Sequence, residues 1–221
     1  MQLRSHQLDS LVAMQQCDKG QIIVPTGGGK TMCMIEDAKY RFNNSRRTIV
    51  VVAPRILLAS QLSADFLEHI TDVNVLHVHS GETHHTSTTK SEEIKTFCIY
   101  PLHLHTIIFT TYHSLHRIQE ADIEIDTIYF DEAHNSVQKN FIEAVEYCSM
   151  YAKRSYFFTA TPKHSRTPKK VGMNDSDIFG QVICNVPAPK LVDEGHILPP
   201  KVVVKKIDVT DDSRFGYEKD C

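Results

Sequence analysis

The sequence predicts an α/β fold, a doubly wound parallel sheet with helices on both faces. Short apolar runs alternate with longer amphipathic segments along the chain, as in folds built from strand–helix–strand units. A glycine-rich loop separates the first apolar run from the helix after it. An Asp–Glu pair ends a later apolar run, and parallel sheets bind ligands at the carboxyl ends of their strands.

Each element is predicted from its period and length. Apolar side chains recur at helical spacing in four segments, and short runs rich in Val, Ile and Phe indicate buried strands. The predicted helices cover residues 5–17, 30–42, 56–70 and 139–151. The predicted strands cover residues 21–25, 46–53, 73–79, 106–111, 125–131, 154–160 and 201–208. Residues 80–95 are rich in Thr, Ser and His, which predicts a surface loop.

Composition limits the classes of function. The 221 residues fit one large domain, and 41% hydrophobic with 23% charged residues is ordinary for a globular protein. A net charge of −3 means that any nucleic-acid contact must be a local patch. No signal segment or apolar run of about 18 residues is visible. We therefore expect an intracellular soluble protein, cytoplasmic or nuclear, with no membrane partner; a viral or phage origin is left open.

Cysteines and histidines give weaker signals. The six cysteines are scattered, which favours small buried hydrophobes in a reducing compartment and predicts no zinc site. Two of the thirteen histidines, His77 and His79, alternate along a predicted strand and could bind a metal on one face. We favour ordinary polar strand and loop positions, because no cysteine or carboxylate cluster accompanies them.

The glycine-rich loop has the features of a phosphate-binding loop. Glycines allow positive φ and close approach of backbone N–H groups to an anion. A lysine can meet the β- and γ-phosphates, a threonine hydroxyl can ligate Mg²⁺, and the following helix adds its dipole. The residues concerned are Pro25, Thr26, Gly27, Gly28, Gly29, Lys30 and Thr31. Val24 departs from the strict pattern, which has a small residue there.

The acidic pair completes a hydrolytic constellation. Asp131 and Glu132 follow the apolar end of the predicted strand at residues 125–131. Asp131 can hold Mg²⁺ through water, and Glu132 can orient and deprotonate an attacking water. With Lys30, they predict a catalytic set for hydrolysis of a nucleoside triphosphate.

The order PTGGGKT, DEAH and TAT along the chain resembles the first motor domain of superfamily-two helicases of the DEAH or DExH kind. Residues 191–200 resemble the closing segment of that domain in restriction-enzyme motor subunits and excision-repair helicases. The resemblance covers roughly residues 2–205. It implies a RecA-like P-loop NTPase fold, ATP and Mg²⁺ as cofactors, and nucleic acid as partner, with DNA favoured over RNA.

The resemblance also implies roles for single residues. Gln7 would read adenine with support from Arg4. Contacts with the nucleic-acid backbone would come from Pro54, Arg55, Thr110 and Thr111. Coupling of the nucleotide state to the rest of the motor would come from His134, Thr159 and Thr161.

The expected domain organisation is a helicase ATP-binding domain at residues 1–200 and the start of a linker at residues 201–221. A second RecA-like domain, in the same or another chain, would supply an arginine finger, so this chain alone should hydrolyse ATP weakly. An ATP-switched nucleic-acid-binding module without motor activity is the alternative, and an unrelated P-loop kinase or GTPase is disfavoured. The basic segment at residues 162–175 could follow a nucleic-acid backbone, but a solvated loop is favoured.

Overall fold

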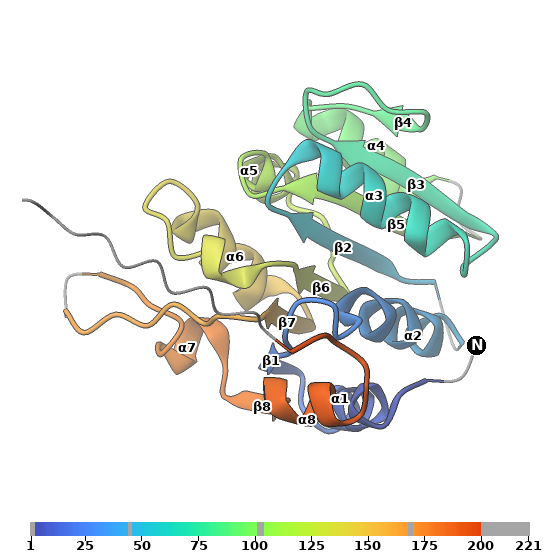
Figure 1. The fold of residues 1–221 in the computed structure, drawn as a ribbon. Coiled ribbons are helices and arrows are strands. Elements are labelled where there is room, and N and C mark those ends of the chain that lie inside the picture. The colour runs from blue at the N-terminus through green and yellow to red at the C-terminus, as the bar shows by residue number, and fades with distance from the viewer. Residues whose placement is uncertain (1–2, 44–45, 101–103, 168–169, 200–221) are drawn as a thin grey trace, which may run out of the picture.

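The computed structural model describes residues 3–43, 46–100, 104–167 and 170–199. In these residues the chain forms an eight-stranded sheet in the order β4-β3-β5-β2-β6-β7-β1-β8 (Figure 1). Every strand pair is parallel. The predicted doubly wound parallel sheet is therefore confirmed. None of the helices in the described ranges is long and apolar enough to cross a membrane.

The strands are short, and all except the two edge strands have buried positions. They are β1 (Lys19–Ile23), β2 (Thr48–Ala53), β3 (Val73–Val78), β4 (Thr86–Ser87), β5 (His105–Thr111), β6 (Thr127–Phe130), β7 (Arg154–Thr159) and β8 (Val182–Asn185). The helices are α1 (Ser5–Gln16), α2 (Lys30–Phe42), α3 (Ile56–Leu67), α4 (Ser91–Ile99), α5 (Leu115–Ala121), α6 (Ile142–Tyr151), α7 (Ser176–Phe179) and α8 (Ala188–Asp193), with a 3₁₀ turn η1 (Ala133–Asn135).

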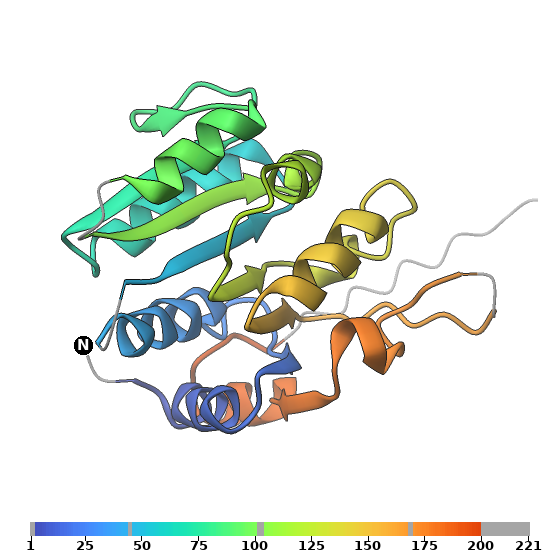
Figure 2. The same cartoon turned by 180° about the vertical axis from the view of Figure 1, so that it is seen from behind.

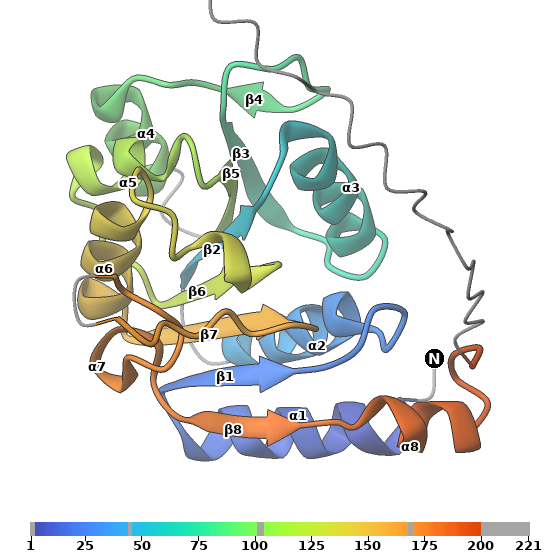
Figure 3. The same cartoon turned by 60° about the vertical axis from the view of Figure 1, so that its left-hand side comes forward.

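Helices cover both faces of the sheet. Figures 1 and 3 show α1, α2 and α3 on one face, and Figure 2 shows α4, α5 and α6 on the other. Alternate residues of β2 supply the two cores: Val50 and Val52 pack on the side of α4–α7, whereas Ile49 and Val51 pack on the side of α1–α3. This period of two follows from the pleat, and burial on both faces explains the continuous apolar runs.

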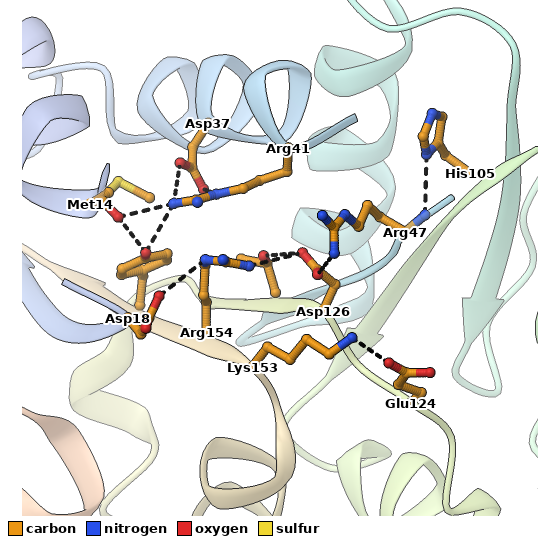
Figure 4. A network of polar contacts seen from close by, with 12 residues as sticks. Met14, Asp18, Asp37, Arg41, Arg47, His105, Glu124, Asp126, Lys153 and Arg154 are labelled. Carbon is orange, nitrogen blue, oxygen red and sulfur yellow. Dashed lines mark hydrogen bonds and ion pairs between the residues drawn. The ribbon is translucent and has the colours of Figure 1, made fainter. Parts of the chain in front are cut away.

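Ion pairs tie the strands together at their amino ends (Figure 4). Asp126, just before β6, accepts from Arg47 at 2.6 Å and from Arg154 at 3.4 Å. Arg154 also pairs with Asp18, just before β1, at 3.2 Å. Each cation and carboxylate therefore joins neighbouring strands. Because this network lies at the opposite end of the strands from the glycine-rich loop, we interpret it as structural.

The buried acid Asp37 in α2 belongs to the same region (Figure 4). Arg41 pairs with it at 3.1 Å, and the Tyr129 hydroxyl donates to it at 2.7 Å. Burial raises the pKa of Asp37, while Arg41 opposes that rise. A buried carboxylate needs such partners to remain charged, so the pair fixes α2 against the sheet.

The prediction of a surface loop at residues 80–95 was wrong in part. Thr86 and Ser87 form the edge strand β4, and α4 begins at Ser91. The helix buries Ile94 against the sheet and has two glutamates in its first turn, where the helix dipole favours negative charge. The segment is too polar in composition to be predicted as a helix, because Ile94 is the one residue of α4 that is buried.

Four further elements, α5, α7, β8 and α8, were not predicted. Each has seven residues or fewer, too short for a period to appear. The segment at residues 162–175 contains no helix or strand where it is described, and Lys163 and Arg166 are exposed. Both a solvated loop and a contact with a nucleic-acid backbone are compatible with this arrangement. The strand predicted at residues 201–208 and the linker at residues 201–221 lie outside the described residues.

Candidate functional site

The phosphate-binding loop lies between β1 and α2, as predicted. Gly27 and Gly29 have φ values of 79° and 82°, which residues with a Cβ rarely adopt. A Cβ on Gly28 would stand 2.5 Å from the Val24 side chain and 2.9 Å from the Pro25 carbonyl oxygen. Val24 is fully buried, so it fills the space beneath the loop. This packing accounts for the valine at a position where the strict pattern has a small residue.

Side chains of the first turn of α1 and of the residue just before it contact all three glycine carbonyls of the loop. Arg4 donates to Gly27 O at 3.3 Å, and Gln7 Nε2 donates to Gly29 O at 3.2 Å. His6 Nε2 lies 2.7 Å from Gly28 O. A carbonyl oxygen facing a phosphate would repel it, and these bonds engage three such oxygens. The predicted residues Arg4 and Gln7 are therefore at the loop.

The acidic pair lies at the carboxyl end of β6 and meets the loop. The Lys30 ammonium is 3.3 Å from Glu132 Oε1. Glu132 has φ 45° and ψ 53°, a left-handed conformation that is uncommon for a residue with a side chain. Asn135 Nδ2 donates to the Glu132 carbonyl at 2.9 Å. The turn thus directs the Glu132 carboxylate toward the phosphate-binding loop.

Asp131 sits in a drier environment than its neighbour. Burial and the Glu132 charge raise the pKa of Asp131 to about 6, and Lys30 opposes that rise. The Tyr112 hydroxyl donates to the Asp131 carbonyl at 2.9 Å, and Asp131 N donates to Val52 O at 2.8 Å. A nearby cation would favour the charged carboxylate. An oxygen-rich site of this kind suits Mg²⁺.

Thr31 is the other predicted Mg²⁺ ligand. It lies in the first turn of α2, next to Lys30, and is half-buried. Because Lys30 reaches Glu132, the start of α2 and the end of β6 lie together at one edge of the sheet. The hydroxyl and the carboxylate are therefore on the two segments that converge here, so the residues present fit a bound magnesium ion.

A chain of polar contacts leads from Glu132 toward β7. His134 Nδ1 lies 3.4 Å from Glu132 Oε2 and 3.1 Å from the Thr159 hydroxyl. Thr161 N donates to the same hydroxyl at 3.2 Å. Strands β6 and β7 are neighbours. The three residues predicted to couple the site are therefore in contact, although their role remains a prediction.

The predicted nucleic-acid contacts divide into two groups. Arg55 is exposed at the start of α3, beside the half-buried Pro54. These two and Thr111 line a groove of about 660 Å³, together with His113 and Gln138. Thr111 is only 3% exposed, so it meets the groove mainly through its backbone, and Thr110 is fully buried with its hydroxyl donating to Val78 O at 2.9 Å. The Thr110 side chain therefore cannot face a ligand in this conformation.

Three residues near the site were missed from the sequence. His6, Tyr112 and Asn135 each hold a backbone carbonyl of the loop or the acidic turn. His6 stands between Arg4 and Gln7 in the same helical turn, which was a usable signal. Tyr112 and Asn135 are recognisable only from the fold, because they bond to the backbone carbonyls of Asp131 and Glu132 rather than to side chains.

Comparison with known proteins agrees with this geometry. Residues 1–164 match the family described as type III restriction enzyme, res subunit. No protein of curated function matches the sequence significantly. Among solved structures, a nuclease-deletion mutant of the type ISP restriction-modification enzyme LlaGI with a DNA substrate mimic superposes with a TM-score of 0.69 at 22% identity. That match covers 89% of this chain and 21% of the other chain.

Two further structures share the fold. The type ISP enzyme LlaBIII bound to DNA has a TM-score of 0.69 at 20% identity, covering 88% of this chain and 16% of that one. The Hef helicase domain of Pyrococcus furiosus has a TM-score of 0.59 at 20% identity, covering 79% and 37%. The matched part is thus a minor part of each of these chains. The chain belongs to the type III restriction enzyme res subunit family, and its parallel sheet has the fold of RecA-like helicase domains.

Proposed function

We propose that this chain binds ATP with Mg²⁺ and hydrolyses it as the first RecA-like domain of a DNA helicase or translocase. The observation that supports this most directly is the 3.3 Å pair between Lys30 and Glu132. It brings the phosphate-binding loop and the acidic motif together at the carboxyl edge of the sheet, where such folds bind nucleotides.

Each residue has a defined task in this proposal. Lys30 leaves Glu132 and binds the β- and γ-phosphates, so that Glu132 becomes free to accept a proton from the attacking water. Thr31 and Asp131 hold Mg²⁺, which neutralises charge on the phosphates when bound. Gln7 and Arg4 contact the adenine.

The DNA-binding part of the proposal depends on the groove beside Arg55. The guanidinium and the backbone of Thr111 lie at the ends of β2 and β5, where donors can meet phosphate oxygens without reading sequence. Two structural relatives are described with DNA or a DNA mimic, which favours DNA here. We propose that residues 1–200 form this domain and that residues 201–221 lead toward a second RecA-like domain.

The proposal is tested first by nucleotide binding. Lys30→Ala should weaken Mg-ATP binding severely, because it removes the cation that faces the phosphates. Lys39→Ala is the matched control, since Lys39 is a partly exposed lysine of the same helix that pairs with Glu36. Fluorescent-nucleotide titration measures both, and unchanged affinity in a folded Lys30→Ala protein would overturn the assignment.

The division of work between the two acids gives a second measurement. Glu132→Gln should leave ATP binding nearly intact while removing residual hydrolysis, because an amide cannot accept the proton. Asp131→Asn should lower nucleotide affinity and its dependence on Mg²⁺ together. If both variants behave alike in binding and in turnover, the roles are assigned wrongly. ATP binding without any turnover in the complete protein would instead favour an ATP-switched binding module.

A further inference from the structure

A histidine–glutamate–histidine cluster joins the start of α1 to the turn after α8. Figures 1 and 3 show α8 beside α1. The rings of His6 and His196 are 5.7 Å apart, and His196 Nε2 is 3.4 Å from Glu194 Oε2. One ligand atom from each of the three residues lies within 4.8 Å of the other two. None of the three is part of the proposed hydrolytic set.

The hydrogen bond of His6 fixes which of its nitrogens is available. Nε2 lies 2.7 Å from Gly28 O, and a carbonyl oxygen only accepts, so Nε2 carries the hydrogen. In the neutral ring, Nδ1 then has a free lone pair. This atom is buried and has no hydrogen-bond partner among the described residues. Buried acceptors without a partner are rare in folded proteins, and an absent ion is one explanation.

We propose that His6, Glu194 and His196 form a binding site for a divalent cation of the Zn²⁺ type. Two imidazole nitrogens and a carboxylate oxygen are a common zinc ligand set, with water at the fourth position. A metal-ligating histidine usually donates its other ring N–H to a carbonyl or carboxylate, as His6 does to Gly28. His6 lies 188 positions before Glu194 and 190 before His196 in the chain, so no motif spacing revealed the set and the sequence predicted no zinc.

The geometry requires a small closure. Metal–ligand distances of about 2.0 Å place tetrahedral ligand atoms about 3.3 Å apart, a separation that Glu194 and His196 already have. One ligand atom of each residue already lies within 4.8 Å of the other two, and the turn can move closer to His6 because Glu194 and Gly195 are exposed. Gly195 has φ 71°, so the turn between the two ligands depends on a glycine.

The cation would fasten the closing segment to the phosphate-binding loop. Leu191 and Ile197 lie against that loop: a Cβ on Gly28 would be 3.1 Å from Leu191, and a Cβ on Gly27 would be 3.4 Å from Ile197. His196 N and Ile197 N both donate to Leu191 O, so the turn moves as a unit. The ion would therefore stabilise the loop through His6 and through these packing contacts.

The test is a Zn²⁺ titration of the purified, chelator-treated chain against a chromophoric zinc indicator, without nucleotide or Mg²⁺. We expect one bound Zn²⁺ per chain. His196→Gln and Glu194→Gln should each lower zinc affinity by at least about 10-fold, since even outer partners of metal ligands contribute that much. His116→Gln, at an exposed position of α5, is the matched control and should leave affinity unchanged.

Two readouts separate the outcomes. With Zn²⁺, backbone amide exchange at residues 191–197 should slow in the wild-type chain and not in His196→Gln; circular dichroism verifies that the variant is folded. Failure of the wild-type chain to bind zinc overturns the proposal, and so does equal binding by His196→Gln. Zinc binding that is lost in His79→Gln instead would place the ion at the other histidine group and would also overturn it. Because nucleotide is absent, the result is independent of the proposed ATPase function.

Discussion

Glu132 occupies a backbone conformation that needs support from its surroundings. Its φ of 45° costs on the order of 1 kcal/mol or more for a residue with a side chain. Lys30 and His134 contact its two carboxylate oxygens, and Asn135 holds its carbonyl. Strain of this kind concentrates where a side chain must be aimed. Here it aims a carboxylate at the loop that would carry the phosphates.

Gln7 holds the phosphate-binding loop, and we propose that it also binds a base. Its Nε2 donates to Gly29 O at 3.2 Å and its Oε1 accepts from Arg4 N at 2.9 Å. Each amide atom can form one more hydrogen bond, enough to pair with the edge of adenine. Gln7→Ala should therefore reduce the preference for ATP over GTP, measured by competition against a fluorescent nucleotide.

The alternative for Gln7 gives a different result in the same assay. If the residue only braces the loop, ATP and GTP affinity should fall by the same factor and discrimination should be unchanged. Gln138→Ala is the matched control, because Gln138 lines the groove near Arg55 rather than the loop and should alter neither affinity. Equal discrimination in the wild-type and Gln7→Ala proteins would remove Gln7 from base recognition.

At the level of single elements, β3 contains a buried histidine pair. Gly81 N donates to His79 Nδ1 at 3.2 Å, so His79 Nε2 donates to His77 Nδ1 at 3.1 Å. His77 Nε2 then donates to the Ser63 hydroxyl of α3, also at 3.1 Å. Every ring nitrogen is used with both rings neutral. Protonating either ring would break this order, so we interpret the pair as a structural contact at buried positions.

The histidine pair should make stability depend on pH. Burial, with the His79 and His85 rings, lowers the pKa of His77 to about 4, whereas an unfolded histidine titrates near 6.5. Between those values the unfolded chain binds a proton that the folded chain does not. The free energy of unfolding should therefore fall as pH drops from about 6.5 toward 4, with no further contribution from His77 below that window.

Urea unfolding at about pH 7.5 and about pH 5 measures this dependence. His77→Gln should lose stability at the higher pH, since the contacts with His79 and Ser63 change, but should show a smaller loss between the two pH values. His116→Gln, an exposed substitution, should keep the wild-type dependence. The same pH dependence in His77→Gln would show that other groups are responsible.

The sequence predicted the central strands and long helices well, because each strand is a short apolar run and each helix has apolar residues at helical spacing. The strand ending at Ala53 and the helix from Lys30 to Phe42 were found nearly to the residue. Predictions failed where elements were short or polar. α4 exposes most of its side chains, and β8 is a four-residue edge strand without a fully buried position.

The candidate site was predictable to the extent that it is encoded by local motifs. Lys30 and Glu132 were expected at one site, and the structure brings them into contact. Thr110 was expected to face nucleic acid, but its strand position turns the hydroxyl toward Val78. That direction depends on register with β3, and register between distant strands is not visible in one sequence.

Across the whole molecule, the amino and carboxyl ends of the strands carry different features. Ion pairs around Asp126 secure the amino ends of the strands, while the carboxyl ends hold the loop, the acidic turn and the Arg55 groove. Nucleic-acid binding by this domain should be weak, independent of sequence and sensitive to salt. Arg55→Ala should reduce affinity uniformly across sequences and lower the slope of log K against log salt by about 0.9 for duplex DNA.

Fluorescence anisotropy at several salt concentrations measures that slope. Arg117→Ala is the matched control, because Arg117 is a partly exposed arginine that lies on α5 and pairs with Glu120 at 2.9 Å. It should leave the slope unchanged. Strong binding that ignores salt would indicate readout of bases and would contradict a phosphate-contact groove.

The contacts between His134, Thr159 and Thr161 should matter only when a second domain is present. They lead away from Glu132 to the end of β7, and they consist of short donors and acceptors rather than charges in contact with phosphate. In a protein that includes both RecA-like domains, Thr159→Ala with Thr161→Ala should spare ATP binding and most hydrolysis. Hydrolysis should, however, no longer drive the separation of nucleic-acid strands. In the isolated chain the double variant should bind nucleotide like the wild type. A large loss of ATP affinity in the isolated chain would instead place these threonines in the nucleotide site itself, and their hydrogen bonds would then serve the phosphate-binding loop directly.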